Sequence, residues 1–214
     1  MAGKVITVAQ QKGGSGKTTL AANLAVAFAR DGRSVAVLDT DPQGSLGRWF
    51  MTRRETGDPG IDFATASAWG VSYECEKLRK HHDYVVIDTP PKADSDLKPA
   101  ITEADLVLVP VSASHVDVWA TEGILDLARR AGRPVLIVLN RAKAGTRVMA
   151  EVTAALADLD APCAEIALGN RVAYAETLGQ GRGVLERGRG AWTAEIDGLA
   201  AEVARQLGAR MAAA

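Results

Sequence analysis

The sequence has few cysteines and no long apolar run, and each of these shortages excludes a class of protein. Its 214 residues include two cysteines, Cys75 and Cys163, whose wide separation fits neither a metal-binding pair nor a redox pair. We therefore expect two reduced thiols in a cytoplasmic protein. No stretch approaches the roughly 20 apolar residues that a membrane-spanning helix needs, and the opening residues lack the pattern of a signal peptide.

The sequence also lacks an excess of charge of either sign. Lys and Arg number 25 and Asp and Glu number 26, for a formal net charge of −1 at pH 7. A protein that binds nucleic acid through its overall charge is strongly basic, so any such contact must come from a local cluster of Arg and Lys. With 47% hydrophobic and 24% charged residues, the composition is typical of a globular protein with a sizeable core.

Short apolar runs rich in Val, Ile and Leu alternate with longer segments of helical periodicity. Runs of this kind are typical of strands buried on both faces, and their alternation with helices predicts a mostly parallel, twisted sheet with helices on both faces. We expect an α/β fold in a single domain over residues 1–214, since no internal repeat or long linker interrupts the pattern. The expected strands are 4–9, 34–39, 83–88, 105–111 and 134–140, with weaker candidates at 61–66 and 163–168, and the clearest expected helices are 16–32, 112–130 and 191–210.

A glycine-rich segment, QQKGGSGKTT (10–19), follows the first expected strand and opens the first expected helix. Strand, loop and helix in that order are the context of a P-loop, in which backbone N–H groups and the helix N-terminus face phosphate oxygens. Lys17 would then reach the β- and γ-phosphates of a nucleotide, and the Thr18 hydroxyl would bind Mg²⁺. The competing interpretation is a glycine-rich turn without a ligand.

The loop departs from the ordinary Walker A pattern, since Gln11 stands where the first glycine belongs and Lys12 adds a second lysine. In this form, Lys-Gly-Gly-x-Gly-Lys-Thr-Thr, it resembles the deviant Walker A motif of the ParA/MinD family of ATPases, with Lys12 as the signature lysine. The resemblance implies a P-loop NTPase fold. Further segments similar to that family follow in the expected order: VLDTDPQG (37–44), DYVVIDTPP (83–91), VLNRA (138–142) and RVAYAETLGQGRGVLE (171–186).

The resemblance implies roles for individual positions. Asp41 would lie at switch I and help to position the attacking water and the magnesium shell, jobs that suit a carboxylate. Asp88 would end a buried strand, where a carboxylate needs a partner, and would hold Mg²⁺ through a water; a helix cap is the alternative. Asn140 would read the adenine edge beside Arg141, while a turn-forming asparagine stays open. The implied catalytic set is Lys12, Lys17 and Asp41, the metal set is Thr18, Asp41 and Asp88, and the nucleotide-binding set is Lys12, Gly13, Gly14, Ser15, Gly16, Lys17, Thr18, Thr19, Asn140 and Arg141.

In the family, the signature lysine reaches across a dimer to the phosphates of the partner subunit. The resemblance therefore implies a weak ATPase with ATP/ADP and Mg²⁺ as cofactors, which forms a homodimer with ATP and separates with ADP. The alternative for Lys12 is a solvated surface lysine beside an ordinary P-loop. Asp117 and Trp119, on the helix expected at 112–130, would lie near the partner subunit, although Trp119 suits core packing equally well.

No helix-turn-helix segment precedes Lys4, so the sequence resembles the short members, which position or segregate a plasmid, a chromosome region or a protein cargo. The dimer would bind nucleoid DNA non-specifically, and a ParB-like or adaptor protein would stimulate hydrolysis. DNA contact would come from arginines that meet phosphates without reading bases. The candidates are Arg171, Arg182, Arg187 and Arg189, with Arg205 and Arg210 behind them and Lys143 and Arg147 as an alternative patch.

Two other functions compete with this hypothesis. A MinD-like, membrane-associated division-site regulator would end in a basic amphipathic helix, whereas the helix expected at 191–210 carries mixed charge and favours core packing. An ATP-dependent ligase such as dethiobiotin synthetase would need a polar substrate pocket that the sequence does not indicate. The segment 179–190, rich in glycine and arginine, is expected to be a loop between two packed helices, with a disordered tail as the alternative.

Overall fold

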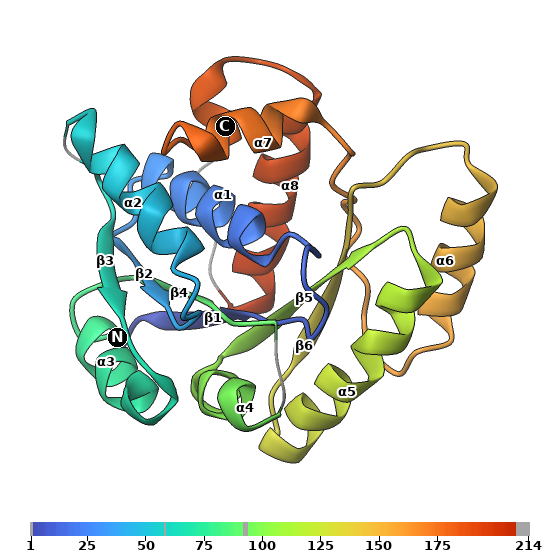
Figure 1. Cartoon of the computed structure of the whole chain (residues 1–214), viewed down its shortest axis with the longest axis horizontal. Helices are drawn as coiled ribbons and strands as arrows, with labels where there is room; N and C mark the ends of the chain where they lie inside the picture. The colour runs from blue at the N-terminus through green and yellow to red at the C-terminus, as the bar shows by residue number, and fades with distance from the viewer. Residues whose placement is uncertain (1, 58, 92–93, 209–214) are drawn as a thin grey trace.

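A six-stranded parallel sheet forms the centre of the computed structural model, which describes residues 2–57, 59–91 and 94–208 (Figure 1). The strand order is β3-β2-β4-β1-β5-β6, and every neighbouring pair is parallel. This confirms the predicted sheet, including the weaker candidate at 61–66. The strands are β1 (Lys4–Val8), β2 (Val35–Asp39), β3 (Asp62–Thr65), β4 (Tyr84–Asp88), β5 (Leu106–Ser112) and β6 (Val135–Asn140).

The second weak strand candidate, 163–168, was wrong. This segment runs beside β6 and touches it through an isolated bridge between Cys163 and Ile137, but it forms no regular strand. The physical reason lies in the spacing of its hydrogen bonds to β6: the N–H of Ala164 donates to the Ile137 carbonyl at 2.7 Å, but the next carbonyl, that of Leu139, accepts from Leu168 at 2.8 Å instead of from residue 166. Four residues of the segment therefore span two residues of β6, which breaks the regular ladder. The segment therefore covers the outer edge of β6 without extending the sheet.

Helices cover both faces of the sheet, as predicted (Figure 1). Side chains alternate along each strand, so Ile6 of β1 joins the core on one face while Val5 joins the core on the other. This double burial explains why the strands read as continuous apolar runs. On one face lie α1 (Lys17–Arg30), α2 (Ser45–Glu55), α7 (Val172–Gly179) and α8 (Ala191–Gln206), and on the other lie α3 (Val71–Leu78), α4 (Asp94–Glu103), α5 (His115–Ala131) and α6 (Arg147–Ala157).

The helix predicted first, α1, shows why its sequence folds as it does. Leu20, Leu24 and Phe28 are spaced four residues apart and are buried against the sheet. Gly32 follows the helix end with φ of 79°, a left-handed conformation that glycine adopts without strain. Ile196 and Leu199 bury the inner face of α8 in the same way.

The segment 179–190 is a loop between two packed helices, as predicted. It joins α7 to α8 and contains one short 3₁₀ helix, η2 (Val184–Arg187); a second one, η1 (Ala68–Gly70), precedes α3. The expected last helix ends at Gln206, so its predicted continuation through Leu207 and Gly208, which form a turn, was wrong; residues 209–210 lie outside the described residues. None of the helices in the described part of the chain is both long and apolar enough to span a membrane.

Candidate functional site

The carboxyl ends of β1, β2 and β4 meet at one edge of the sheet. In the strand register, Asp88 lies beside Val8 on one side and beside Asp39 on the other. β2 and β4 lie on one side of β1, and β5 lies on the other. In open α/β sheets, the loops that follow strands at such a point frame a binding crevice. The glycine-rich loop follows β1 and the segment with Asp41 follows β2, so the fold brings the predicted motifs together.

The glycine-rich loop curls ahead of α1 into a cradle of backbone N–H groups. Gly14 and Gly16 have φ of 78° and 93°, so both positions favour glycine. A Cβ on Gly16 would lie 2.3 Å from Nδ2 of Asn140, which excludes any larger residue there. The Ser15 side chain is buried, and its Oγ has no hydrogen-bond partner. Successive N–H groups leading into a helix N-terminus form a site for anions such as phosphates.

The amine of Lys17 lies inside this cradle. It donates to the carbonyl oxygens of Gln10, at 3.0 Å, and of Lys12, at 3.4 Å. Burial lowers the pKa of Lys17, while the nearby carboxylates of Asp88 and Asp41 act in the opposite direction. A buried cation whose acceptors are neutral carbonyls is stabilised by an anionic ligand, so this amine is placed to exchange them for phosphate oxygens.

Asp88 offers an unused carboxylate oxygen beside the cradle. Its Oδ2 accepts a hydrogen bond from the Thr18 hydroxyl at 2.6 Å, while its buried Oδ1 has no partner. Burial raises the pKa of Asp88 to about 7, against the opposing effects of the Thr18 hydrogen bond and of Lys17. A bare oxygen next to a hydroxyl fits Mg²⁺, which binds few protein ligands when phosphates and water complete its shell. Within the described ranges no group of three His, Cys, Asp or Glu side chains could hold a metal without such help.

Asp41 lies in the turn between β2 and α2. Its Oδ1 accepts from the N–H of Gln43 at 2.9 Å, and its own N–H donates to Oδ1 of Asp39 at 3.0 Å. Asp39 was not among the residues predicted from the sequence, although its place at the end of a buried strand was an available signal. Burial raises the pKa of Asp39, and hydrogen bonds from the N–H groups of Gly47 and Asp41 oppose that rise.

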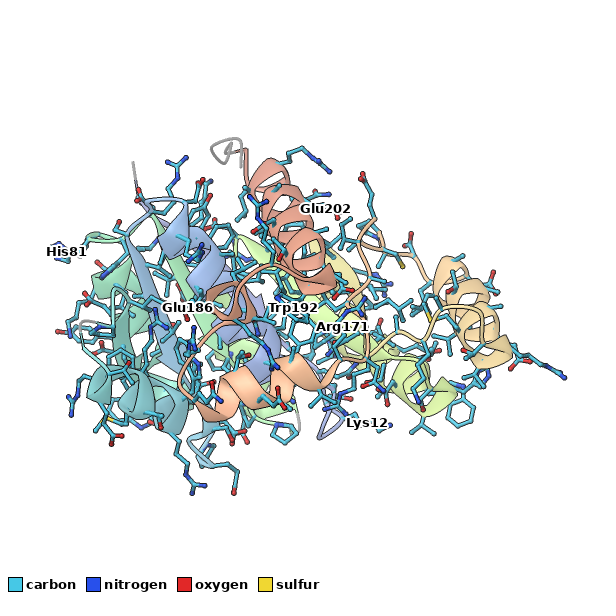
Figure 2. All side chains as sticks on the ribbon, turned by 90° about the horizontal axis from the view of Figure 1, so that it is seen from above. Lys12, His81, Arg171, Glu186, Trp192 and Glu202 are labelled. Atoms are coloured by element: carbon cyan, nitrogen blue, oxygen red, sulfur yellow. The ribbon has the colours of Figure 1, made fainter. Side chains whose placement is uncertain are left out.

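Lys12 points away from the cradle and pairs with Asp117 in the first turn of α5. The Asp117 carboxylate is buried, and its other oxygen accepts from the N–H of Ser112 at 3.0 Å. The Lys12 side chain is 37% exposed and lies at the edge of the molecule (Figure 2). Trp119, two residues after Asp117 on α5, is 67% exposed, so the interpretation of this ring as core packing was wrong.

A cavity of about 350 Å³ opens beside the cradle, within the size range of small-ligand pockets. Asn140 forms part of its wall, donating from Nδ2 to the carbonyl of Ser15 at 2.8 Å and accepting from the N–H of Arg141 at 2.9 Å. One amide hydrogen and one lone pair of Asn140 therefore stay available for a ligand. The walls also include Gly16, Thr19, Leu20, Asn23, Arg141, Leu168, Gly169, Asn170, Arg171, Val172, Tyr174, Ala175 and Ile196.

Comparison with known proteins agrees with this geometry. Residues 6–184 match the family described as the CobQ/CobB/MinD/ParA nucleotide binding domain. The chain belongs to this family. Its relatives include "Maintenance of carboxysome distribution protein A" (McdA) of Gloeobacter kilaueensis, which is 32% identical over 205 residues that cover 91% of this chain and 90% of the relative. "Chromosome partitioning protein ParA" of Caulobacter vibrioides is 34% identical over 170 residues, which cover 61% of this chain and 62% of the relative.

Solved structures of ParA/MinD proteins share the fold. The ATP complex of a Cyanothece McdA variant superposes with a TM-score of 0.75 at 17% identity and covers 100% of this chain and 99% of that chain. MinD of Pyrococcus horikoshii OT3, complexed with Mg-ADP, superposes with a TM-score of 0.79 at 20% identity and covers 94% of this chain and 95% of that chain.

In this ParA/MinD domain, Arg171 lines the cavity beside the cradle. Its guanidinium donates to Oε1 of Glu195 at 2.6 and 2.9 Å, and the other oxygen of Glu195 accepts from the Tyr174 hydroxyl at 2.7 Å. Burial alone would raise the pKa of Glu195, but these hydrogen bonds hold that pKa below its usual value. The sequence did not indicate Tyr174 and Glu195 as site residues, because their partners lie more than twenty residues apart.

Three more of the arginines proposed for DNA contact lie on the loop 179–190, while Arg205 lies on α8 and pairs with Glu165. Arg187 pairs with Glu176 and lies over the Trp192 ring, and Arg182 donates to the carbonyl of Glu186. Arg189 is exposed, and Arg210 lies outside the described residues. Figure 2 shows Glu186, Trp192 and Arg171 on the face covered by α7 and α8. Since Arg171 and Arg187 already hold carboxylates, this face is less positive than its arginine content indicates.

The same loop is fastened to α1 and α2, the helices that follow the glycine-rich loop and the turn with Asp41. Arg53 of α2 donates two hydrogen bonds to the Glu186 carboxylate, at 2.8 and 2.9 Å. Trp49 of α2 donates from Nε1 to the carbonyl of Arg182 at 3.2 Å, and Asn23 of α1 accepts from the N–H of Val184 at 2.7 Å. These contacts fasten the arginine loop to α1 and to the middle and last turn of α2.

Replacing Glu186 with alanine is expected to destabilise the domain by about 2 kcal/mol, because Arg53 would keep a largely buried charge without its partner. The side chains of Arg53 and Glu186 are only 14% and 20% exposed, so solvent screens this pair weakly. Urea unfolding followed by circular dichroism measures the loss. The matched control is Glu76→Ala, which removes an exposed pair with Lys80 and should leave the unfolding midpoint unchanged. Equal midpoints for Glu186→Ala and the unmodified protein would contradict the prediction.

Proposed function

We propose that this ParA/MinD-family chain is an ATPase that binds Mg-ATP, pairs with a second copy of itself in the ATP-bound state and separates once ATP is hydrolysed. The observation that carries the proposal is the different placement of the two lysines in one loop. The Lys17 amine lies inside the cradle, whereas the Lys12 amine is held outside it by Asp117. A lysine directed out of its own cradle suits a phosphate group bound by another subunit.

The chemistry follows from the residues around the cradle. Backbone N–H groups of the loop and the Lys17 amine would hold the phosphates, while Thr18 and Asp88 would hold Mg²⁺. When bound, Mg²⁺ would neutralise charge on the phosphate oxygens. Asp41 would orient the attacking water, and Asn140 with Arg141 would contact the base in the adjoining cavity. Such a site relies on positioning and charge alone, so we expect slow turnover until a partner protein completes it.

We further propose that the ATP-bound dimer binds nucleoid DNA non-specifically in the cytoplasm and positions a cargo, with a ParB-like or adaptor protein stimulating hydrolysis. The relatives that match over most of both chains are named for carboxysome distribution, which favours a protein assembly as the cargo. Arg182 and Arg189 are the first candidates for phosphate contacts, because Arg171 and Arg187 would have to exchange a carboxylate for a phosphate. The apolar face of α8 is buried in the core, so this helix offers no membrane-binding face.

Sedimentation velocity tests the proposal. The 22.5 kDa chain is expected to sediment as a monomer with Mg-ADP and as a dimer with Mg²⁺ and a non-hydrolysable ATP analogue. With random-sequence DNA, the protein should form a fast-sedimenting complex in the presence of the ATP analogue but not of Mg-ADP. That complex should dissociate as the salt concentration is raised. Monomers in both nucleotides would contradict the proposed switch. ATP-dependent dimers that do not bind DNA would contradict the proposed DNA binding but not the proposed nucleotide-dependent dimerisation.

A further inference from the structure

The carboxylate of Asp39 is buried at the end of β2 and is 2% exposed. Its Oδ1 accepts the N–H of Asp41 at 3.0 Å, and its Oδ2 accepts the N–H of Gly47 at 2.9 Å. One side chain therefore holds both ends of the turn that contains Asp41.

This arrangement replaces the usual helix cap. The N-cap position of α2 is Gly44, which has φ of 64° and no side chain to accept the free N–H groups of the first turn. Asp39 accepts the N–H of Gly47 from outside the helix, and its charge lies where the positive end of the helix dipole stabilises an anion. The start of α2 and the backbone of Asp41 are thus fixed to the same strand end.

Asp39 shares no hydrogen bond with the cradle, and, after burial, its charge helps to raise the pKa of the neighbouring Asp88. The Thr18 hydroxyl bonds Asp88, and Lys17 bonds carbonyl oxygens of the loop, whereas the hydrogen bonds of Asp39 come from backbone N–H groups of the turn and of α2. The hydrogen bonds of Asp39 would therefore affect a bound nucleotide through the position of Asp41.

We propose that Asp39 is the positioning residue of Asp41, fixing the turn so that the Asp41 carboxylate faces the terminal phosphate of the nucleotide. This inference rests on the proposed function, in which Asp41 orients the attacking water. Displacing such a group by about 1 Å can lower the rate roughly 100-fold without weakening substrate binding. Loss of the contact between Asp39 and the Asp41 N–H should therefore lower the rate of hydrolysis by much more than its small contribution to folding stability indicates.

The test uses Asp39→Asn, which preserves the shape of the side chain, and Asp39→Ala as a second variant. Either orientation of the introduced amide places an N–H donor against one of the backbone N–H groups, so the turn loosens. ATP turnover is expected to fall roughly 10- to 100-fold, while the ATP dissociation constant stays within about threefold, because the hydrogen bonds of Lys17 and Thr18 in the cradle do not involve Asp39. Combining Asp39→Asn with Asp41→Ala should be no slower than Asp41→Ala alone, since both changes remove one function.

Amide hydrogen exchange supplies a readout independent of turnover. In the nucleotide-free protein, residues 40–47 of Asp39→Asn should exchange roughly tenfold faster, which corresponds to the loss of about one hydrogen bond. The control is Asp83→Asn at the opposite end of the sheet, where the carboxylate accepts from N and Oγ of Ser34, both at 2.9 Å. This variant should change neither turnover nor exchange at 40–47.

Three results would each overturn the inference. They are additive losses of turnover in the double variant, unchanged amide exchange at residues 40–47 of Asp39→Asn, and turnover of Asp39→Asn equal to that of the unmodified protein. The outcome can also be separated from the proposed function. If the unmodified protein binds no ATP and hydrolyses none, the proposed function fails, while exchange at 40–47 still tests whether Asp39 holds the turn.

Discussion

Replacing Lys17 with alanine is expected to lower the affinity for ATP roughly 100-fold and to abolish turnover. A hydrogen bond to a charged group contributes about 1.5–3 kcal/mol, and the upper part of that range corresponds to about two orders of magnitude in affinity. Lys17 is largely buried, so its charge acts on the phosphates with little screening by solvent. The carbonyl oxygens of Gln10 and Lys12 that it now bonds lie within the loop, so the change should leave the fold intact.

Two measurements check this expectation. Titration calorimetry gives the ATP affinity directly, and thermal unfolding with and without Mg-ATP shows whether a bound nucleotide stabilises the native state. Saturating Mg-ATP should raise the unfolding temperature of the unmodified protein and leave that of Lys17→Ala unchanged. Lys77→Ala, which removes an exposed lysine of α3, is the matched control and should behave like the unmodified protein. If Lys17→Ala binds ATP with unmodified affinity, the cradle is not the phosphate site.

The prediction of the fold from the sequence succeeded where local pattern decides structure. The strand that ends at Val8 and the one that ends at Asp88 are continuous apolar runs, and such runs are buried between two layers of helices whatever the order of the strands. The candidate at 163–168 failed because its N–H groups meet β6 out of step, with Leu168 and not residue 166 bonding the Leu139 carbonyl. An apolar pattern shows which residues are buried, but it does not show where their backbone hydrogen bonds go.

In the candidate site, too, the contacts among the motifs were predicted and those between other distant side chains were not. Lys17, Thr18 and Asp88 lie together as their motifs indicated, because parallel strands place their carboxyl ends at one edge. Contacts between side chains far apart in the sequence were not predicted, such as the pair of Arg53 with Glu186. Arg171 illustrates the limit, since it was grouped with a surface arginine cluster and instead lines the cavity while bonded to Glu195. Charge density along a sequence does not show which charges are already paired.

Replacing Lys12 with alanine separates binding from pairing. ATP should still bind within about threefold of the unmodified affinity, because the amine of Lys12 lies outside the cradle and the Lys17 contacts are retained. ATP-induced dimers, by contrast, should be lost, since each subunit would face the partner's phosphates without the cation that makes the pairing depend on ATP.

Sedimentation velocity with Mg²⁺ and the non-hydrolysable ATP analogue distinguishes the outcomes for Lys12→Ala, and titration calorimetry on the same preparation confirms that nucleotide is bound. Lys4→Ala, at the opposite end of β1 from the cradle, is the matched control and should dimerise normally. If Lys12→Ala forms dimers at the same concentration as the unmodified protein, the lysine does not act across the interface. Its ion pair with Asp117 would then be a contact within one subunit that helps to hold the loop against α5. Loss of dimers with ATP still bound would instead assign the two lysines of one loop to two different nucleotides.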